Sequence, residues 1–433
     1  MSSLLYENIT VIDESFDARS GMYLGIRGEV IDYLSDKAPE EHYDEVRSGE
    51  GHVACPAFYN IHSHLPMVLL RGYAENLALA DWLNTRVFPF EAKIEGEDLY
   101  YATLMAQAEA LRFGCVSCTE MYFRLPYIFA ANEVSGFKLN ASNAIVCFGN
   151  TDFESLSEYK EYMSCLADPA IAASDRFRLD MAVHAEYTTN PVIVRRAAEF
   201  AKEHGMNMHL HMSETMSEHE ECKGRHGMTP AAYFESLGAF DVPCTAAHCV
   251  HLEGEDFEIL ARKGVTVANN TVSNLKLASG FANVGAMLKA GINVGLGTDG
   301  VASNNNLNMF EELKLFATIN KALSGDPTLI TPAQALYAAT RAGALSQGRK
   351  DCGLIKEGFK ADIMILDTDN CYMTPVHNMT ANIVYSAQGS DVVTTICDGK
   401  ILYDHGEYTT IDIEKARYEV SSRARRISDS VGG

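Results

Sequence analysis

The sequence predicts an α/β protein: a TIM-type (β/α)8 barrel with a small β-sandwich domain formed by the N- and C-terminal segments. Two observations lead to this fold class. Eight short apolar runs alternate with amphipathic helical stretches through the middle of the 433-residue chain, and strand-like patterns occupy both of its ends. The predicted divisions are residues 1–55 and 351–433 for the small β-domain, whose second segment ends in a helix, and residues 56–350 for the barrel.

The eight apolar runs are the predicted barrel strands. Each is short, and apolar residues recur at helical spacing between them, as repeated βα units require. Helices are expected over residues 96–114, 190–205 and 253–264. Pro191 suits a first helical turn and Gly205 suits a helix end. In chain order, the runs are 57–64, 114–123, 139–149, 177–186, 205–214, 242–250, 264–271 and 291–300.

The two ends of the chain show β-structure patterns without the βα alternation. Because both flank the barrel, we expect them to pair with each other in one small domain. A final helix is expected over residues 413–433. The segments expected to carry strands are 8–13, 21–34 and 49–56 before the barrel, and 353–367 and 381–408 after it.

Composition and charge exclude several classes of function. Hydrophobic residues make up 47% of the chain and charged residues 21%, a balance typical of globular proteins. The formal charge of −23 would repel nucleic acid and anionic membranes. The N-terminus lacks signal-peptide features, and no apolar run reaches the roughly 18 residues of a membrane span. The 11 scattered cysteines fit reduced packing residues, so we expect a cytoplasmic protein whose partner is a small molecule.

Histidine and carboxylate residues gather at the ends of the predicted strands. The first run ends with His62 and His64, which strand alternation places on one face. Because the carboxyl ends of barrel strands surround one mouth, where barrel enzymes carry out their chemistry, these side chains are expected to converge. The further strand-end residues are His184 on the fourth run, His209, His211 and Glu214 on the fifth, His248 on the sixth and Asp299 on the eighth.

This set of residues predicts a metal site at the barrel mouth. A histidine in an apolar run costs free energy unless its nitrogens find partners, and a divalent cation suits several imidazoles and a carboxylate. Hydrogen-bonded core histidines are the alternative, which fits one isolated histidine better than a set spread over several strands. The chain has no HExxH motif, no H-x-E with a following P-C-x-x-C, and no lysine in the fourth run to bridge two ions. We therefore expect one metal ion.

Several segments together carry the motifs of a known family. They are 56–94, 209–215 (HLHMSET), 246–252 (AAHCVHL), 273–280 (SNLKLASG), 297–313, 358–367 and 384–400. These segments resemble the amidohydrolase superfamily, most closely its methylthioadenosine/S-adenosylhomocysteine deaminase and chlorohydrolase-related branch. The resemblance extends over nearly the whole chain, and the motifs are more specific for the superfamily than for a substrate.

The resemblance implies a role for each candidate residue. The implied cofactor is one divalent ion, zinc first, with iron, manganese or nickel as alternatives. The implied metal ligands are His62, His64, His211 and Asp299. The implied catalytic residues, which handle protons, are Glu214, His248 and Asp299, and the implied substrate contacts are Trp82, Glu91 and His184, with Glu91 holding ribose hydroxyls.

Two features depart from the family pattern. His184 matches a histidine that normally sits in a segment like His-Ser-Pro-Tyr, whereas Ala185 and Glu186 follow it here. The family's arginine that grips the amino-acid carboxylate of S-adenosylhomocysteine has no clear match near residues 143–153. Both departures weaken the assignment of S-adenosylhomocysteine more than they weaken deamination.

The expected function is hydrolytic deamination of an adenine-type nucleoside: methylthioadenosine, adenosine or S-adenosylhomocysteine. Water activated by the metal would attack the amino-bearing ring carbon, and ammonia would leave. One alternative is an aminohydrolase of another heteroaromatic ring, such as guanine, a pterin, cytosine or a triazine. Another is a barrel that serves as a non-catalytic module. A homo-oligomer, dimer or tetramer, is also expected.

Overall fold

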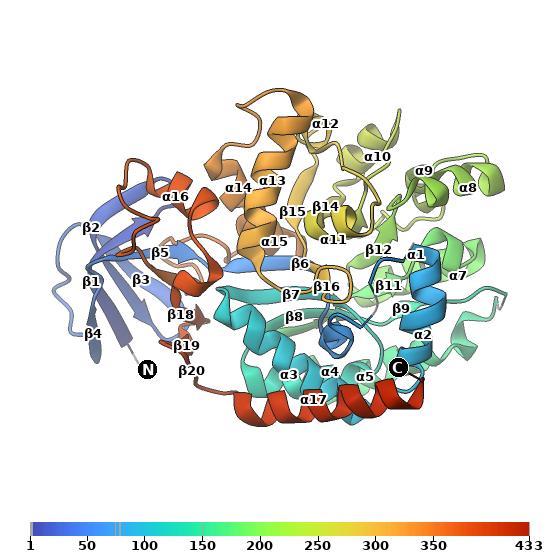
Figure 1. Ribbon diagram of the computed structural model, residues 1–433, viewed down its shortest axis with the longest axis horizontal. Helices are drawn as coiled ribbons and strands as arrows, with labels where there is room; N and C mark the ends of the chain where they lie inside the picture. Colours follow the sequence, from blue (N-terminus) through green and yellow to red (C-terminus); the bar gives the residue numbers. More distant parts are fainter. Residues whose placement is uncertain (1–2, 74, 78, 150, 433) are drawn as a thin grey trace.

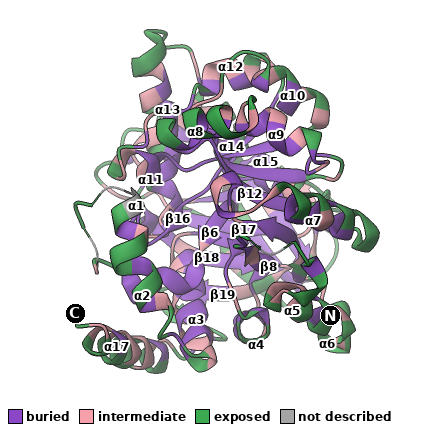
Figure 2. Cartoon of the chain, turned by 90° about the vertical axis from the view of Figure 1, so that its right-hand side faces the viewer, coloured by how far each residue is buried: buried purple, intermediate pink, exposed green. Residues whose placement is uncertain are grey.

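The barrel and the small β-domain lie side by side in the structure, a computed structural model (Figure 1). The chain enters the barrel after Pro56 and returns to the β-domain before Ile363. Figure 2 shows buried barrel strands at the centre, surrounded by helices whose outer faces are exposed. The residues that the structure describes are 3–73, 75–77, 79–149 and 151–432.

The barrel strands coincide with the eight apolar runs. In the described part of the chain they are β6 (Phe58–His64), β7 (Cys115–Met121), β8 with β9 (Lys138–Ser142 and Ala144–Ile145), β10 with β11 (Phe177–Leu179 and Met181–Val183), β12 (Met208–Met212), β13 (Cys244–His248), β14 (Thr266–Asn269) and β15 with β16 (Asn293–Leu296 and Asp299–Gly300). Parallel pairing runs through β10-β8-β7-β6-β16 and through β15-β14-β13-β12-β11-β9. Because both arrays share the third, fourth and eighth strands, which break at Asn143, Asp180 and Gly297–Thr298, they form one closed ring. The predicted (β/α)8 barrel is confirmed.

The connecting helices begin and end where local chemistry favours it. In α7 (Pro191–His204), the Asn190 side chain accepts a hydrogen bond from the Ile193 amide (3.1 Å), and Gly205 ends the helix with a φ of 65°. The helices of the barrel region are η1 (Leu65–Leu70), α1 (Leu79–Trp82), η2 (Leu83–Val87), α2 (Phe88–Glu91), α3 (Gly96–Arg112), α4 (Leu125–Ser135), η3 (Phe153–Ser155), α5 (Ser157–Ala167), α6 (Pro169–Ala172), η4 (Glu186–Thr188), α7, α8 (Met216–His226), α9 (Pro230–Ser236), α10 (Asp256–Lys263), α11 (Thr271–Lys276), α12 (Val284–Lys289), α13 (Met309–Ser324), α14 (Pro332–Ala339) and α15 (Arg341–Ser346).

The two ends of the chain pair with each other in one small β-domain, as predicted, and the domain is built on one mostly antiparallel sheet. Its strands are β1 (Ser3–Ile12), β2 (Ala18–Arg27), β3 (Val30–Ser35), β4 (Glu45–Ser48), β5 (His52–Pro56), β17 (Ile363–Asp367), β18 (Val392–Cys397), β19 (Lys400–Asp404) and β20 (Glu407–Tyr408), with the short helix η5 (Gly389–Asp391) before β18. The N- and C-terminal segments meet where β5 pairs with β17, Cys55 opposite Met364. The divisions at residues 55/56 and 350/351 remain predictions.

One segment near the C-terminus differs from the expectation of strand structure over 381–408. Helix α16 (Met379–Tyr385) occupies its beginning. The Asn378 side chain caps this helix by accepting a hydrogen bond from a first-turn amide, and Ile383 and Val384 are buried. β-branched residues favour strands locally, but a cap and a buried helical face outweigh that preference here.

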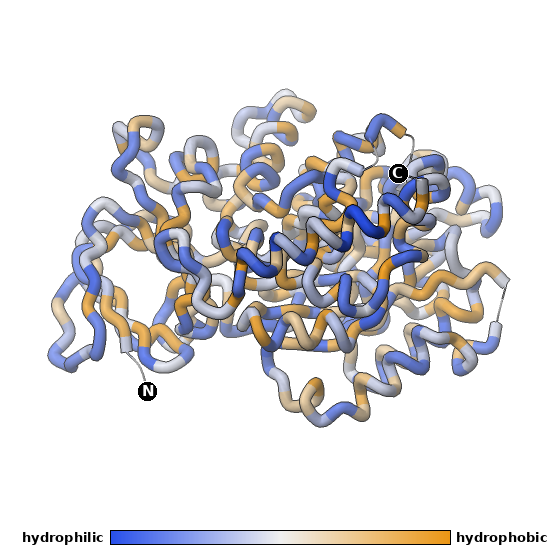
Figure 3. The backbone as a smooth tube through the Cα atoms, turned by 60° about the horizontal axis from the view of Figure 1, so that its bottom comes forward, coloured by the Kyte–Doolittle hydropathy of each residue, from blue (hydrophilic) through white to orange (hydrophobic). Residues whose placement is uncertain are grey.

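The final helix, α17 (Ile413–Ser430), lies along the barrel and not on the small sheet (Figure 1). Figure 3 brings this face forward and shows hydrophilic stretches interrupted by apolar turns along the helix. Arg423 and Arg426 reach the two carboxylate oxygens of Asp98 in α3, at 2.9 and 2.5 Å. Through the described part of the chain, no helix has the length and apolar character needed to cross a bilayer.

A buried ion cluster joins the amino end of the barrel to the β-domain. Nζ of Lys138, at the start of β8, lies 2.5 Å from a carboxylate oxygen of Asp362 and 2.8 Å from one of Asp398. The hydroxyl of Tyr59, near the start of β6, also donates to Asp362. Burial favours the neutral lysine, but the surrounding charges, Asp362 foremost, outweigh it and raise the pKa of Lys138. The lysine therefore stays charged at neutral pH.

Candidate active site

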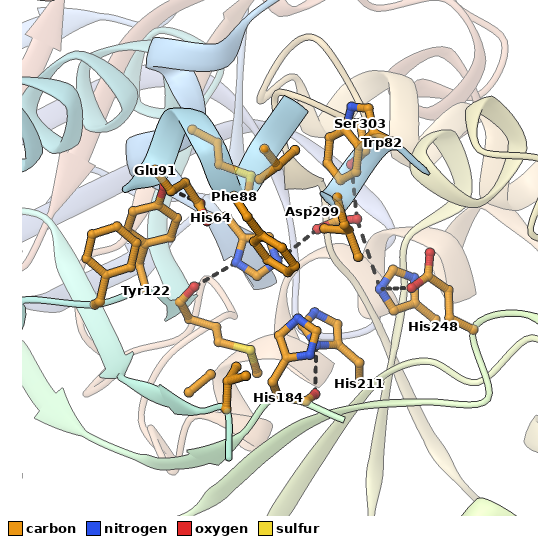
Figure 4. A pocket seen from close by; sticks show the side chains of 18 of the residues that line it. His64, Trp82, Phe88, Glu91, Tyr122, His184, His211, His248, Asp299 and Ser303 are labelled. Atoms are coloured by element: carbon orange, nitrogen blue, oxygen red, sulfur yellow. Dashed lines mark hydrogen bonds and ion pairs between the residues drawn. The ribbon is translucent and has the colours of Figure 1, made fainter. Parts of the chain in front are cut away.

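The carboxyl ends of the barrel strands surround a pocket that contains nearly every residue singled out from the sequence. Figure 4 shows side chains from different strands and from the helical segment above them pointing toward a common centre. His62 lies beneath this pocket, fully buried. The predicted residues that line the pocket are His64, Trp82, Glu91, His184, His211, Glu214, His248 and Asp299.

Asp299 lies at the centre of the cluster. Its Oδ1 is 3.4 Å from Nε2 of His62 and 3.2 Å from Nε2 of His64. Its Oδ2 accepts hydrogen bonds from the hydroxyls of Ser273 (2.6 Å) and Ser303 (3.1 Å). Burial alone would raise the pKa of this carboxyl, but the contacts with both histidines outweigh it and hold the pKa of Asp299 well below its usual range.

Backbone carbonyls orient two of the histidine rings. Nδ1 of His64 lies 2.7 Å from the carbonyl oxygen of Met121, and Nδ1 of His211 lies 2.9 Å from that of His184. A carbonyl accepts only from a protonated nitrogen, so each ring carries a proton on Nδ1, and in the neutral ring Nε2 is a lone-pair donor. This tautomer is the one that a metal ligand needs.

The donor set fits a divalent metal ion. Nε2 of His62 is buried without a hydrogen-bond partner, while its Nδ1 lies 2.9 Å from Nε2 of His209. A buried nitrogen without a partner is costly, and a cation would use its lone pair. Imidazole nitrogens with one carboxylate are the ligands that zinc and similar ions prefer. At the barrel mouth, two donor groups of the described residues have atoms within 4.8 Å of one another: His62 with His64 and Asp299, and His62 with His211 and His248.

Glu214 and His248 face the pocket from the ends of neighbouring strands. Nε2 of His248 lies 3.8 Å from Oε2 of Glu214 and 4.0 Å from Oδ2 of Asp299. Nδ1 of His248 lies 2.8 Å from Oδ1 of Asn274, and Glu214 accepts a hydrogen bond from the Ser279 hydroxyl (3.2 Å). Burial raises the pKa of Glu214, which favours its protonated form. One carboxyl able to donate a proton therefore stands near one that stays ionised.

Backbone strain is concentrated at these strand ends. Ser213, His248 and Asp299 have φ values of 50°, 73° and 61°, in the left-handed region that side chains with a Cβ disfavour. Surrounding bonds hold them there: the Ser213 amide donates to Glu218 (2.9 Å), and the Gly300 amide donates to Asp299 (2.8 Å). Strain of this kind persists only where the surrounding structure enforces it, and it gathers at functional sites.

A helical segment above the pocket carries Trp82 and Glu91. Helices α1, η2 and α2 follow one another from Leu79 to Glu91, and the middle turn is a π-helix, a form often found at functional sites. Oε1 of Glu91 accepts a hydrogen bond from the Tyr122 hydroxyl (2.6 Å), and burial raises the pKa of Glu91 to about 7. The side chains of this segment that line the pocket are Trp82, Leu83, Val87, Phe88 and Glu91.

The fourth strand ends in the turn that departs from the family pattern. His184 lines the pocket, with Nδ1 3.1 Å from the Thr188 hydroxyl, and burial lowers its pKa to about 4. Glu186 is absent from the described pocket lining. Its buried carboxylate pairs instead with Arg225 and His226. The Glu186 side chain therefore forms an ion pair behind the described pocket lining, while His184 and Tyr187 of the same turn line the pocket.

The structure adds site residues that the sequence patterns did not single out. Tyr122 is the second-last residue of the second apolar run, and that position was its only signal. Glu120, at the same strand end, lies behind the pocket and accepts hydrogen bonds from the Ser63 hydroxyl (2.9 Å) and the Leu65 amide (2.8 Å). Further lining residues are Met67, Phe123, Asn143, Val146, Tyr187 and Leu277.

Comparison with known protein families shows to which family the chain belongs. A sequence model of the Amidohydrolase family matches residues 53–402. The chain belongs to this family. The match spans the whole barrel and all of the predicted site residues, so the resemblance inferred from the motifs is confirmed.

Amidohydrolases of known name resemble the chain over most of its length. It is 39% identical over 396 residues to a 5-methylthioadenosine/S-adenosylhomocysteine deaminase of Dictyoglomus thermophilum, covering 92% of each chain. It is 41% identical over 387 residues to one of Desulforamulus reducens, covering 89% of this chain and 88% of that one. The structure of an adenosine deaminase from Xanthomonas campestris with bound zinc matches with a TM-score of 0.93, 29% identity and 99% coverage of both chains. The predictions of a hydrolytic deaminase and of a metal-dependent hydrolase are confirmed.

Proposed function

We propose that this amidohydrolase deaminates adenine-type nucleosides: methylthioadenosine, adenosine or S-adenosylhomocysteine. One observation carries the proposal. Glu214 and Asp299, two buried carboxyls with opposite pKa shifts, both lie within 4.0 Å of Nε2 of His248 in a single pocket. Hydrolytic deamination needs one group that gives a proton to the ring and another that takes a proton from water. The names of the relatives support the adenine ring.

One divalent ion would be held by His62, His64, His211 and Asp299. Zinc is the first candidate, with iron, manganese or nickel as alternatives, and the zinc in the Xanthomonas campestris neighbour supports this order. A bound divalent ion supplies hydroxide near neutral pH by lowering the pKa of coordinated water. The two donor groups share His62, which supports a single ion.

The chain's own residues would move the protons. Glu214, whose pKa is raised by burial, would donate to the ring nitrogen beside the attacked carbon and make that carbon electrophilic. Asp299 would take the proton of the attacking water, because its low pKa keeps it ionised. His248 keeps Nε2 toward the pocket while Asn274 holds its Nδ1, so it would stabilise the tetrahedral centre. The amino group would leave as ammonia after gaining a proton.

Trp82, Glu91 and His184 would bind the substrate. Glu91, fixed by Tyr122 on one oxygen, would accept ribose hydroxyls with the other. Trp82 and the apolar side chains beside it would pack against the nucleoside. No lysine or arginine lines the described part of the pocket, which supports methylthioadenosine or adenosine over S-adenosylhomocysteine, whose amino-acid carboxylate would lack a cation.

The test is ammonia release by metal-loaded protein with methylthioadenosine, adenosine, S-adenosylhomocysteine, guanine and a pterin side by side. We expect turnover of methylthioadenosine or adenosine and little of S-adenosylhomocysteine. Turnover of guanine or the pterin alone would favour the second candidate, an aminohydrolase of another heteroaromatic ring. The altered turn after His184 is the observation that keeps this candidate open.

We also propose that the protein acts in the cytoplasm as a homo-oligomer and does not bind nucleic acid. The charge of −23 supports the last point, because such a field repels phosphate. Light scattering coupled to size exclusion checks the oligomer, and a mobility-shift assay with duplex DNA checks the absence of binding. A monomeric mass or a retarded DNA band would contradict these proposals.

A further inference from the structure

A buried ion pair links the turn after His184 to the helix after Glu214. The side chain of Glu186, two residues after His184, is 1% exposed. Its carboxylate accepts from Nε (3.1 Å) and Nη2 (2.5 Å) of Arg225, and its Oε1 lies 2.7 Å from Nε2 of His226. Hydrogen-bonding partners are needed there, because a buried carboxylate without partners is strongly unfavourable. The proposed reaction itself uses none of these three side chains.

Arg225 and His226, the partners of Glu186, lie at the C-terminal end of helix α8. The N-terminal end of this helix contacts the backbone around Glu214. The Thr215 hydroxyl caps the helix by accepting from the Glu218 amide (3.1 Å). The Glu218 carboxylate in turn accepts from the backbone amides of Ser213 (2.9 Å) and Glu214 (2.7 Å). Since a helix is stiff along its axis, α8 ties the position of Glu214 to the position of Glu186.

On the other side, the turn that contains Glu186 fixes His184. The Thr188 hydroxyl lies 3.1 Å from Nδ1 of His184 and accepts from the Ala185 amide (3.0 Å). The carbonyl of His184 also orients the His211 ring (2.9 Å). A shift of this turn would therefore move the His184 ring and the carbonyl that sets the His211 tautomer.

We propose that Glu186 is a positioning residue: its ion pair with Arg225 and His226 holds His184 in register with Glu214. The inference rests on the proposed roles of those two residues as substrate contact and proton donor. A shift of about 1 Å between reacting groups can cost roughly 10²-fold in rate. The ion pair of Glu186 with Arg225 and His226, here called the clamp, can therefore control turnover from outside the pocket.

The test compares two matched variants as full-length, metal-loaded protein. Glu186→Gln removes the buried charge and keeps the side-chain volume. Glu221→Gln removes the other carboxylate partner of Arg225, an exposed one at 3.0 Å, and leaves Glu186 in place. We expect Glu186→Gln to lower kcat for methylthioadenosine or adenosine by at least about 10-fold with metal content unchanged. Glu221→Gln should keep kcat and KM within about two-fold.

Stability and kinetics separate positioning from a purely structural role. If Glu186→Gln lowers Tm but leaves kcat per folded molecule intact, the proposal is wrong. Arg225→Lys keeps the charge and loses the two-pronged guanidinium, so it should lose part of kcat. Combined with Glu186→Gln it should lower kcat no further, because both changes break one contact. Independent, additive losses would contradict the proposal. If Glu186→Gln does not fold, the kcat of Arg225→Lys alone tests the proposal.

Hydrogen exchange gives a readout that does not depend on activity. Wild-type protein that releases no ammonia from any adenine nucleoside would overturn the proposed function, and the clamp would then be judged by exchange alone. Faster amide exchange over 184–188 and 213–218 in Glu186→Gln, but not in Glu221→Gln, supports the clamp. Unchanged exchange in Glu186→Gln overturns it.

Discussion

The two ends of the barrel both bury charged and polar groups, but they satisfy them differently. At the amino end, Lys138 lies between Asp362 and Asp398, and opposite charges meet within 2.8 Å. At the carboxyl end, Nε2 of His62 has no hydrogen-bond partner and Asp299 is strained. The amino end uses buried charge to join two parts of the fold, whereas the carboxyl end keeps unmet bonding capacity for a metal ion and a substrate.

The pKa shifts follow the same division. At the amino end, Lys138 and Asp362 favour each other's charged forms, which raises the pKa of the lysine and lowers that of the carboxyl. At the carboxyl end, burial raises the pKa of Glu91 to about 7 and also raises that of Glu214. Lys138 and Asp362 therefore keep their charged forms at neutral pH, whereas burial brings the Glu91 carboxyl at the mouth into the range where it exchanges its proton.

The largest expected effect at the mouth comes from His64→Ala. This change removes one nitrogen of the proposed metal site, so metal content and ammonia release should fall together to background. The fold should survive, because His64 lies at a strand end and not in the closed core. Metal analysis, activity and circular dichroism on one preparation check this, and full activity without bound metal would contradict it.

At the amino end, Lys138→Met should cost stability and leave chemistry intact. It strands the buried carboxylate of Asp362, a change that typically costs about 3–5 kcal/mol. Denaturant unfolding measures the loss, and kcat per folded molecule should stay at the wild-type value. Lys360→Met, which breaks an exposed pair with Glu29, is the matched control and should cost at most about 1 kcal/mol. Equal losses in both variants would mean that burial of the Lys138 pair contributes nothing.

A smaller effect is expected from Glu91→Ala, which sharpens the assignment of the ribose contact. Removing hydrogen bonds to a charged group costs about 1.5–3 kcal/mol, so kcat/KM for adenosine should fall roughly 10- to 100-fold. The free base adenine, which has no ribose, should lose little. Tyr122→Phe, which removes the hydroxyl that holds Glu91, should show a weaker version of the same pattern. Equal losses for nucleoside and base would remove the ribose argument.

The smallest expected effect is a pH dependence that the mouth has and the amino end lacks. Because burial raises the pKa of Glu91 to about 7, its charge, and with it nucleoside affinity, should increase as pH rises through 7. The same shift affects stability. The contribution of Glu91 to the free energy of unfolding should decrease as the pH rises from the ordinary pKa of a glutamate toward 7. As the pH rises through 7, KM for adenosine should therefore fall several-fold. Glu91→Gln should remove this pH dependence of KM. A step that persists in the variant would assign it to another group.

The sequence was sufficient for the barrel and for the convergence of His62, His64, His211 and Asp299. Both depend on local patterns: strand alternation fixes which way a side chain points, and barrel geometry brings strand ends together. The approach of Glu214 to His248 follows from the same rule.

Those local patterns could not predict contacts between residues that lie far apart in the chain. Lys138 and its partner Asp362 are 224 residues apart, and Glu186 finds Arg225 39 residues later in the chain. No spacing rule links such residues, so Glu186 appeared only as a departure from a motif. Helix α16 was missed for the opposite reason, since its β-branched residues favour a strand locally while burial and a cap favour the helix.

The measurement that tests the central claim most directly is kcat and metal content of Glu214→Gln beside wild type. The variant keeps the volume and the hydrogen-bonding capacity of the side chain but cannot give its proton to the ring. We predict full metal occupancy, an unchanged Tm and a kcat lower by about 10²- to 10⁴-fold on methylthioadenosine or adenosine. Wild-type turnover by the metal-loaded variant would contradict the account, because the carboxyl at the mouth would then have no part in the chemistry.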